Sequence, residues 1–140
     1  MSVFRGDLYF LSNMYPCDVK INVAGNIMLM HSSETVFQAL KCKNLEDINL
    51  FLNLNGYEAK KLGKKVALRS DWEEVKLDVM RYAIKCKFTQ NSEIAEKLKA
   101  FDGEIVEENA WNDTYWGVCN GVGQNWLGKL LMETRDEMRG

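Results

Sequence analysis

Residues 19–41, "VKINVAGNIMLMHSSETVFQALK", carry the pattern that decides the fold class. Apolar and polar residues alternate on both sides of Ala24-Gly25-Asn26, which predicts a β-hairpin with its turn at these residues. Ser32 and Ser33 follow directly and can cap a helix that runs through residues 34–42. A hairpin that leads into a helix differs from the strand–helix alternation of a doubly wound sheet, so the stretch favours an α+β fold.

The rest of the chain predicts more helices than strands. The expected helices cover residues 46–53, 57–66, 70–88, 92–101 and 125–138, and "EIVEEN" at 104–109 predicts a short strand. Asn55-Gly56 is a turn dipeptide near the end of the first of these helices, and Gly63 weakens the middle of the second. Ser70 and Glu73 form a capping box at the start of the longest helix. We therefore expect residues 1–140 to form a single α+β domain, mostly helical, with a small β-hairpin or sheet.

Charge and composition exclude several classes of function. The formal net charge of -2 gives no overall attraction to nucleic acid or to an anionic membrane. The N-terminal residues lack the pattern of a signal peptide, and no apolar run approaches the roughly 20 residues that span a bilayer. The chain has one histidine and four scattered cysteines, Cys17, Cys42, Cys86 and Cys119, without a CxxC pair. We expect no metal site, no disulfide framework and a cytoplasmic location with reduced thiols.

A polar stripe lies on the helix predicted after the hairpin. Steps of 100° per residue place Glu34, Gln38 and Lys41 on one face, while Val36 and Phe37 lie mainly on the other. A solvated helix face is the interpretation that the spacing alone favours. The alternative is that an acid, an amide and an amine point together into a cleft.

Other candidate positions also have a structural and a functional interpretation. Trp72 begins an apolar helical stripe and is expected in the core, at its edge if one ring face contacts a ligand. Residues 60–69 gather four lysines and one arginine, which form a solvated face or, less simply, a contact for phosphate. His31, between a strand and a serine cap, is expected to be a structural hydrogen-bonding residue.

The stretch 112–128, "NDTYWGVCNGVGQNWLG", combines Asp113, the adjacent aromatic rings of Tyr115 and Trp116, and four glycines. Gly121-Val122-Gly123 lacks the third glycine of a dinucleotide-binding fingerprint, so a Rossmann site is excluded. Glycines before a helix allow phosphate oxygens to approach the N–H groups at the positive end of the helix dipole. Ordinary turns explain the same glycines equally well.

The order of six motifs resembles that of the NADAR superfamily, which includes YbiA-like N-glycosidases. The motifs are "FRGDLYFLSNMYP", "SSETVFQALK", "RSDWEEVKLDVM", "KFTQN", "DTYWG" and "GVGQNWLGKLLMETR", and together they run from Phe4 to Arg135. The sequence departs from the family pattern at Met14, where phenylalanine is common, and at Thr35, where histidine is common. These departures weaken the choice of a particular substrate and leave the chemistry intact.

The resemblance implies an N-glycosidase that hydrolyses the bond between ribose C1 and a base nitrogen, without a metal or cofactor. The implied substrate is a ribosylamino-pyrimidine phosphate of riboflavin biosynthesis or ADP-ribose carried on guanine in nucleic acid. It implies catalytic roles for Glu34, Lys41 and Asp113. It implies substrate-binding roles for Phe10, Ser12, Asn13, Gln38, Trp72, Trp116, Gly117, Gly123, Asn125 and Arg135.

A module that binds ADP-ribose or a related nucleotide without catalysis is the alternative function. It would use Trp72, Trp116 and the glycine-rich loop and would not depend on Glu34 or Lys41. No membrane contact and no stable protein partner are expected in either case.

Overall fold

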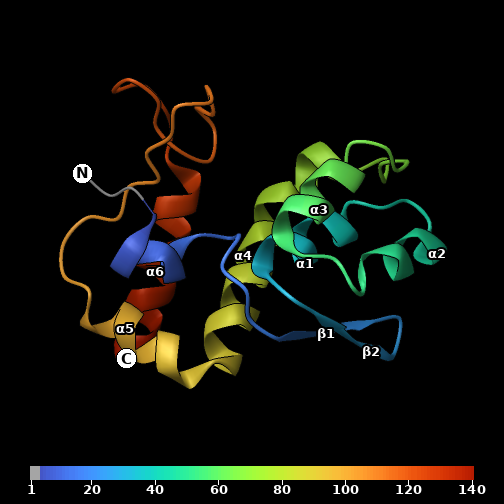
Figure 1. Ribbon diagram of the computed structural model, residues 1–140, viewed down its shortest axis with the longest axis horizontal. Coiled ribbons are helices and arrows are strands. Elements are labelled where there is room, and N and C mark those ends of the chain that lie inside the picture. The colour runs from blue at the N-terminus through green and yellow to red at the C-terminus, as the bar shows by residue number, and fades with distance from the viewer. Residues whose placement is uncertain (1–3) are drawn as a thin grey trace. The chain divides into compact units, whose positions relative to one another are not determined.

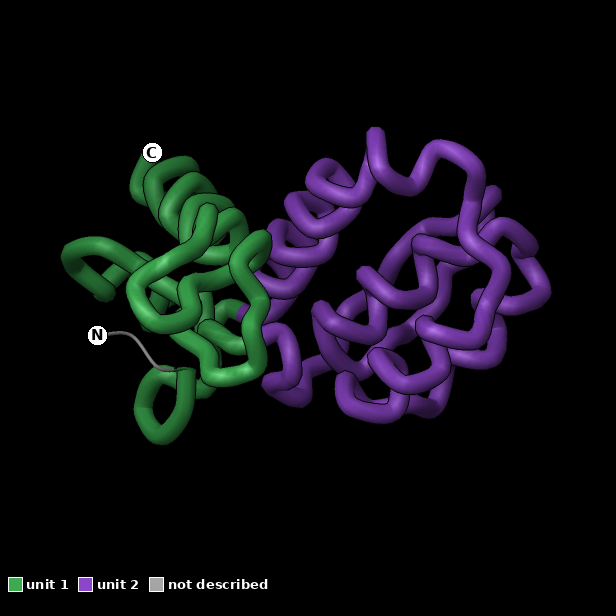
Figure 2. The backbone as a smooth tube through the Cα atoms, turned by 90° about the horizontal axis from the view of Figure 1, so that it is seen from above, with its two compact units in different colours: residues 1–12, 92–140 green, residues 13–91 purple. Residues whose placement is uncertain are grey.

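The computed structural model describes residues 4–140, which divide into two compact units (Figure 2). Unit 2 comprises residues 13–91, and unit 1 comprises residues 1–12 and 92–140. Helices dominate both units, and a two-stranded antiparallel sheet is formed in unit 2, so the α+β class predicted from the sequence is confirmed.

The strands and α-helices of unit 2 are labelled in Figure 1, and the elements of this unit follow in chain order. They are β1 (Val19–Val23), β2 (Asn26–Met30), α1 (Ser33–Leu40), α2 (Leu45–Ile48), the 3-10 helix η2 (Asn49–Phe51), α3 (Gly56–Leu62) and α4 (Trp72–Gln90). Apolar side chains of the hairpin, α1, α2, η2, α3 and α4 form one buried cluster, which includes Val19, Ile21, Met30, Val36, Ala39, Ile48, Phe51, Ala59 and Ala83.

The hairpin forms where the sequence predicts it. Ala24 and Gly25 have φ values of 51° and 87°, and two consecutive positive values are what a two-residue hairpin turn requires. The outer edge of β1 is closed by α4, because the Gln90 side chain accepts from the Lys20 N–H at 2.7 Å and donates to the Lys20 carbonyl at 2.8 Å. Asn91 also donates to the Asp18 carbonyl at 3.0 Å, so the end of α4 is held against this strand.

Two predicted helix boundaries in unit 2 are wrong. The helix expected to run through Gly63 ends at Leu62, and Asn55 starts it by forming a capping box with Glu58. The box expected at Ser70 and Glu73 is absent, since Asp71 occupies the N-cap position of α4 and makes no side-chain cap bond. The Asp71 carboxylate is instead bonded to Arg69 at 2.6 Å and 3.0 Å.

Unit 1 contains the 3-10 helix η1 (Gly6–Leu11), α5 (Ser92–Ala100) and α6 (Trp126–Arg139). Both α-helices were predicted, whereas the strand expected at residues 104–109 is wrong. This segment makes only an isolated bridge between Glu108 and Val118. The Asn125 side chain forms two hydrogen bonds with the backbone of this segment. It donates to the Ile105 carbonyl at 2.9 Å and accepts from the Glu107 N–H at 2.9 Å.

Candidate active site

Helix α1 carries the acid and the amide that the sequence places on one stripe, and the amine of Lys41 follows at its C-cap. Glu34 and Gln38 are 8% and 5% exposed, and Gln38 Nε2 donates to Glu34 Oε2 at 2.6 Å. The solvated-face interpretation favoured by the spacing is therefore wrong for these two residues. A buried carboxylate with an amide donor is a group whose position is fixed, which suits a role in chemistry.

Asn13 fixes the beginning of the helix that holds Glu34. Its carbonyl accepts from the Glu34 N–H at 3.0 Å, and its side-chain oxygen accepts from Ser33 Oγ at 2.8 Å. The amide nitrogen of Asn13 contacts Met80 Sδ of α4 at 3.3 Å. The predicted site residue Asn13 thus lies beside Glu34 and anchors its backbone.

Lys41 follows α1, and its amine lies beside two aromatic rings that pack against each other. Its Nζ lies 5.8 Å from the Phe37 ring centroid and 5.7 Å from the Trp72 ring centroid, and the two rings are 5.1 Å apart. Burial lowers the pKa of Lys41, while the nearby Glu34 carboxylate raises it. The aromatic faces favour the ammonium form and partly offset the effect of burial. This arrangement presents an amine whose protonation is adjustable, next to a fixed acid.

Trp72 is 7% exposed, in agreement with its expected place in the core. Its ring also forms one wall beside Lys41, so the structural and functional interpretations apply to the same side chain. Phe37 forms the other wall, although its place on the apolar side of the helix predicts a core residue only. The signal was its position one helical turn before Lys41, where residues four apart are neighbours.

The remaining predicted site residues belong to unit 1. They are Phe10, Ser12, Asp113, Trp116, Gly117, Gly123, Asn125 and Arg135. Phe10 is 5% exposed and packs in η1 beneath Lys97, whose Nζ is 5.9 Å from the ring centroid. Ser12 follows the last turn of η1, and its N–H donates to the Tyr9 carbonyl.

Asp113 organises the turn that carries the aromatic pair. Its Oδ1 accepts from the N–H groups of Tyr115 at 3.1 Å and Trp116 at 2.9 Å. The rings of Tyr115 and Trp116 meet edge to face, with centroids 4.7 Å apart and planes at 89°. The carboxylate thereby fixes the direction of the Trp116 backbone.

Gly117 and Gly123 allow neighbouring segments of unit 1 to pack closely against each other. A Cβ on Gly117 would overlap the side chain and carbonyl of Glu107, and a Cβ on Gly123 would overlap the Gly117 carbonyl. Gly123 also has φ of 155°, which side-chain-bearing residues rarely adopt. The chain's own atoms occupy the space that these glycines leave open.

Asn125 and Arg135 hold the backbone of unit 1. Asn125 is buried, and its amide bonds Ile105 and Glu107 as described above. Arg135 is 8% exposed and donates to the carbonyls of Phe101 and Gly103, both at 2.7 Å, at the end of α5. These contacts give both side chains a structural role.

The basic and imidazole side chains singled out from the sequence lie at the surface. Lys60, Lys61, Lys64 and Lys65 are exposed on and after α3. His31 pairs with Asp18 at 3.4 Å, in keeping with the structural role predicted for it. Within residues 4–140, no three histidine, cysteine or acidic side chains are grouped so that they could hold a metal ion.

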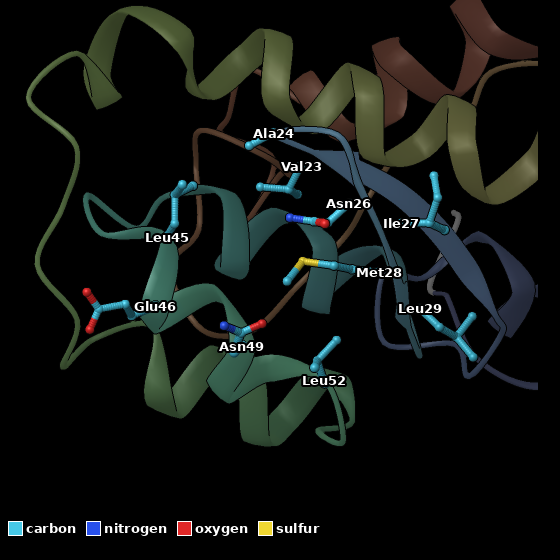
Figure 3. A pocket seen from close by; sticks show the side chains of 10 residues that line it. All are labelled: Val23, Ala24, Asn26, Ile27, Met28, Leu29, Leu45, Glu46, Asn49 and Leu52. Carbon is cyan, nitrogen blue, oxygen red and sulfur yellow. The ribbon is translucent and has the colours of Figure 1, made fainter.

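A pocket of about 420 Å³ lies in unit 2 between the hairpin and the α2–η2 segment (Figure 3). It is lined by Val23, Ala24, Asn26, Ile27, Met28, Leu29, Leu45, Glu46, Asn49 and Leu52. Its lining is mostly apolar and contains none of the predicted site residues, so it adds nothing to the cluster on α1.

None of the helices described between residues 4 and 140 is both long and apolar enough to cross a membrane.

Comparison with known proteins places these observations in a family. A model described as the NADAR domain matches residues 3–139. A riboflavin biosynthesis protein of Vibrio vulnificus (strain YJ016) is 33% identical over 137 residues, covering 93% of this chain and 35% of that protein. The N-glycosidase YbiA of Shigella boydii serotype 4 (strain Sb227) is 46% identical over 72 residues, covering 51% of this chain and 45% of that protein. Both matches span less than half of the relative's own length.

A solved structure shows the same fold. The NMR structure of the E. coli protein YbiA superimposes with a TM-score of 0.83 and 32% sequence identity. The superposition covers 99% of this chain and 83% of the other, so it includes both compact units.

Proposed function

The chain belongs to the NADAR family, and on that premise we propose that it is an N-glycosidase acting on a ribosylated nucleotide. It hydrolyses the bond between ribose C1 and a base nitrogen. Relatives named as an N-glycosidase and as a riboflavin biosynthesis protein support this class of reaction. The family model runs through both compact units, which supports treating residues 1–140 as one domain.

The observation that carries the proposal is the placement of a buried acid in the first turn of α1 and an amine at the residue that caps the same helix. Lys41 Nζ lies 5.8 Å and 5.7 Å from the ring centroids of Phe37 and Trp72, and Glu34 accepts from Gln38 at 2.6 Å. Cleavage of a ribose–nitrogen bond builds positive charge on the sugar, which a fixed carboxylate stabilises more in the transition state than in the ground state. The same carboxylate accepts a proton from an attacking water.

Lys41 acts as a nucleophile in the mechanism that we favour. Ring opening breaks the bond from C1 to the ring oxygen, which takes up a proton, and leaves C1 double-bonded to the base nitrogen. The neutral amine of Lys41 adds to this C=N bond, and the bond from C1 to the base nitrogen then breaks as the base leaves with a proton. The resulting Schiff base between Lys41 and C1 is hydrolysed by water, which restores the amine and releases the sugar. The lowered pKa of Lys41 supports this role, because it increases the neutral fraction of the amine near neutral pH.

We propose two further roles from the family resemblance. Asp113 moves protons during cleavage, and Trp116 packs against the base or the sugar. Stacking on an aromatic ring contributes roughly 1–3 kcal/mol per base. The substrate is a ribosylamino-pyrimidine phosphate or ADP-ribosylated guanine in nucleic acid, and the reaction needs no metal.

The test is a cleavage assay with both substrates. Purified protein is incubated with a ribosylamino-pyrimidine phosphate and, separately, with DNA that carries ADP-ribosylated guanine, each with and without a chelator. We expect release of ribose phosphate or of ADP-ribose from one of them at a rate that the chelator leaves unchanged. Loss of cleavage on chelation would overturn the metal-independent mechanism.

Calorimetry with ADP-ribose separates catalysis from binding alone. Tight binding without cleavage of either substrate would replace the proposed enzyme with a nucleotide-binding module. In that case substitution of Glu34 or Lys41 would leave the affinity unchanged.

A further inference from the structure

Gly63 occupies a position where the backbone does not require glycine. It follows the last residue of α3, with φ of -59° and ψ of -19°, which are helical values. Alanine adopts these angles readily and is more favourable than glycine in a helical conformation. The reason for glycine at this position must therefore lie in what surrounds it.

The space beside Gly63 is filled by the side chain of Gln38. A Cβ on Gly63 would overlap Gln38 Oε1 and would lie 2.8 Å from Gln38 Cδ. Helix α1, which carries Gln38, and helix α3, which Gly63 follows, lie side by side in Figure 1. The missing side chain of Gly63 is thus what allows the Gln38 amide to take its position.

The orientation of that amide is fixed from both ends. Oε1 is buried against Gly63 and has no hydrogen-bond partner among the residues that the structure describes. Nε2 donates to Glu34 Oε2 at 2.6 Å. A flipped amide would place an oxygen against the Glu34 carboxylate, and two acceptors cannot bond each other. The present orientation supplies a donor, which favours the ionised carboxylate.

We propose that Gly63 is a positioning residue for Glu34, acting through Gln38. The effect on catalysis rests on the N-glycosidase function proposed above, whereas the effect on the Gln38 amide does not. A methyl group at position 63 displaces the amide, and Glu34 loses its donor and its fixed orientation.

A double-mutant cycle tests the proposal with Gly63→Ala, Gln38→Ala and the double variant. We expect Gly63→Ala to lower kcat by at least ~10-fold with KM changed less than ~3-fold, because an interaction made in the transition state is lost. In the Gln38→Ala background the same substitution should cause no further loss, since the side chain that it displaces is gone. Lys61→Ala, at an exposed position of α3, is the matched control and should retain wild-type kcat.

Thermal unfolding gives a second test, because Gly63→Ala should change Tm in opposite directions in the wild-type and Gln38→Ala backgrounds. Gly63→Ala should lower Tm in the wild-type background through overlap with Gln38. In the Gln38→Ala background that overlap is gone, so the higher helix propensity of alanine should raise Tm, against a tight contact of 3.2 Å between the new Cβ and the Ala59 carbonyl. Equal effects of Gly63→Ala in both backgrounds would overturn the proposal.

An NMR measurement keeps this inference separate from the proposed activity. The side-chain amide protons of Gln38 should exchange slowly in the wild type and shift and exchange faster in Gly63→Ala. If the wild type cleaves no substrate, the proposed function fails, while the amide signals and the Tm cycle still decide the positioning role. Unchanged Gln38 amide signals in Gly63→Ala would refute it.

Discussion

Replacing Lys87 with methionine should stabilise the protein at neutral pH and remove part of its pH dependence. Lys87 lies in the last turn of α4 and is 1% exposed, with Nζ 5.6 Å from the Tyr15 ring centroid and 5.0 Å from the Phe88 ring centroid. Burial lowers the pKa of Lys87 to about 7, against a smaller raising effect of Cys17. Methionine keeps most of the apolar length and removes the charge.

The direction of this pH dependence follows from the number of protons that the folded and the unfolded chain bind. The unfolded chain holds the Lys87 proton up to a pKa of 10.5 and the folded chain only up to about 7, so the unfolded state binds more protons between these values. The free energy of unfolding therefore rises with pH across this window. Between pH 7 and pH 8.5 the two pKa values give an increase of about 1.6 kcal/mol. This is an upper value, because the aromatic faces of Tyr15 and Phe88 stabilise the ammonium form.

Urea unfolding followed by tryptophan fluorescence measures this slope at pH 7.0, 7.5, 8.0 and 8.5. Burial also raises the pKa of the Cys17 thiol above its ordinary value, and that group lowers the free energy of unfolding as pH rises further, so the range stops at 8.5. The free energy of unfolding of Lys87→Met should vary less with pH than that of the wild type. At pH 7 it should exceed the wild-type value by roughly 1–4 kcal/mol.

Lys85→Met is the matched control on the same helix and should keep the wild-type slope, because Lys85 is only half-buried. A wild-type stability that is flat or falls between pH 7 and pH 8.5 would refute the reasoning. So would a Lys87→Met protein that is less stable than the wild type at pH 7.

Three other substitutions give direct tests. Lys41→Arg keeps the charge but cannot form an imine, so turnover should fall by at least ~100-fold while calorimetry shows largely intact binding. Borohydride added during turnover should trap an adduct on the wild type alone, and an active Lys41→Arg enzyme would limit Lys41 to ligand binding. Asn55→Ala removes the capping box of α3 and should lower the free energy of unfolding by about 1 kcal/mol in urea, and an unchanged value would contradict the capping role. Arg135→Ala removes both bonds to the end of α5 and should cost about 2–3 kcal/mol in the same assay, whereas Arg135→Ala with wild-type stability would show that those bonds contribute nothing.

The parts of the fold predicted correctly depend on local chemistry. Ala24-Gly25 specifies a tight turn through backbone conformation, and Ser32 starts α1 by accepting from the Thr35 N–H at 3.0 Å. The strand predicted at residues 104–109 fails because Asn125, about 20 residues away, supplies the bonds that a strand partner would have made. No window of local sequence contains that information.

The candidate site was predictable as a set of residues and not as an environment. Periodicity places Glu34, Gln38 and Lys41 on one stripe, but it does not reveal whether the stripe faces water. That outcome depends on α3 packing against α1, with Gly63 leaving room for the Gln38 amide. The exposed-face interpretation failed because the decisive contact joins residues 25 positions apart in the sequence.

The closure of the β1 edge by Gln90 has a consequence for synthesis of the chain. Lys20 and Gln90 are 70 residues apart, so the hairpin emerges from the ribosome long before the side chain that completes its edge. Until α4 has formed, the Lys20 N–H and carbonyl are open to pairing with another strand, as at any unprotected sheet edge. At a synthesis rate of about 5–20 residues per second, this interval lasts on the order of 4–14 seconds. Slow codons between positions 30 and 90 would prolong the exposure of this edge and should increase aggregation of the nascent chain.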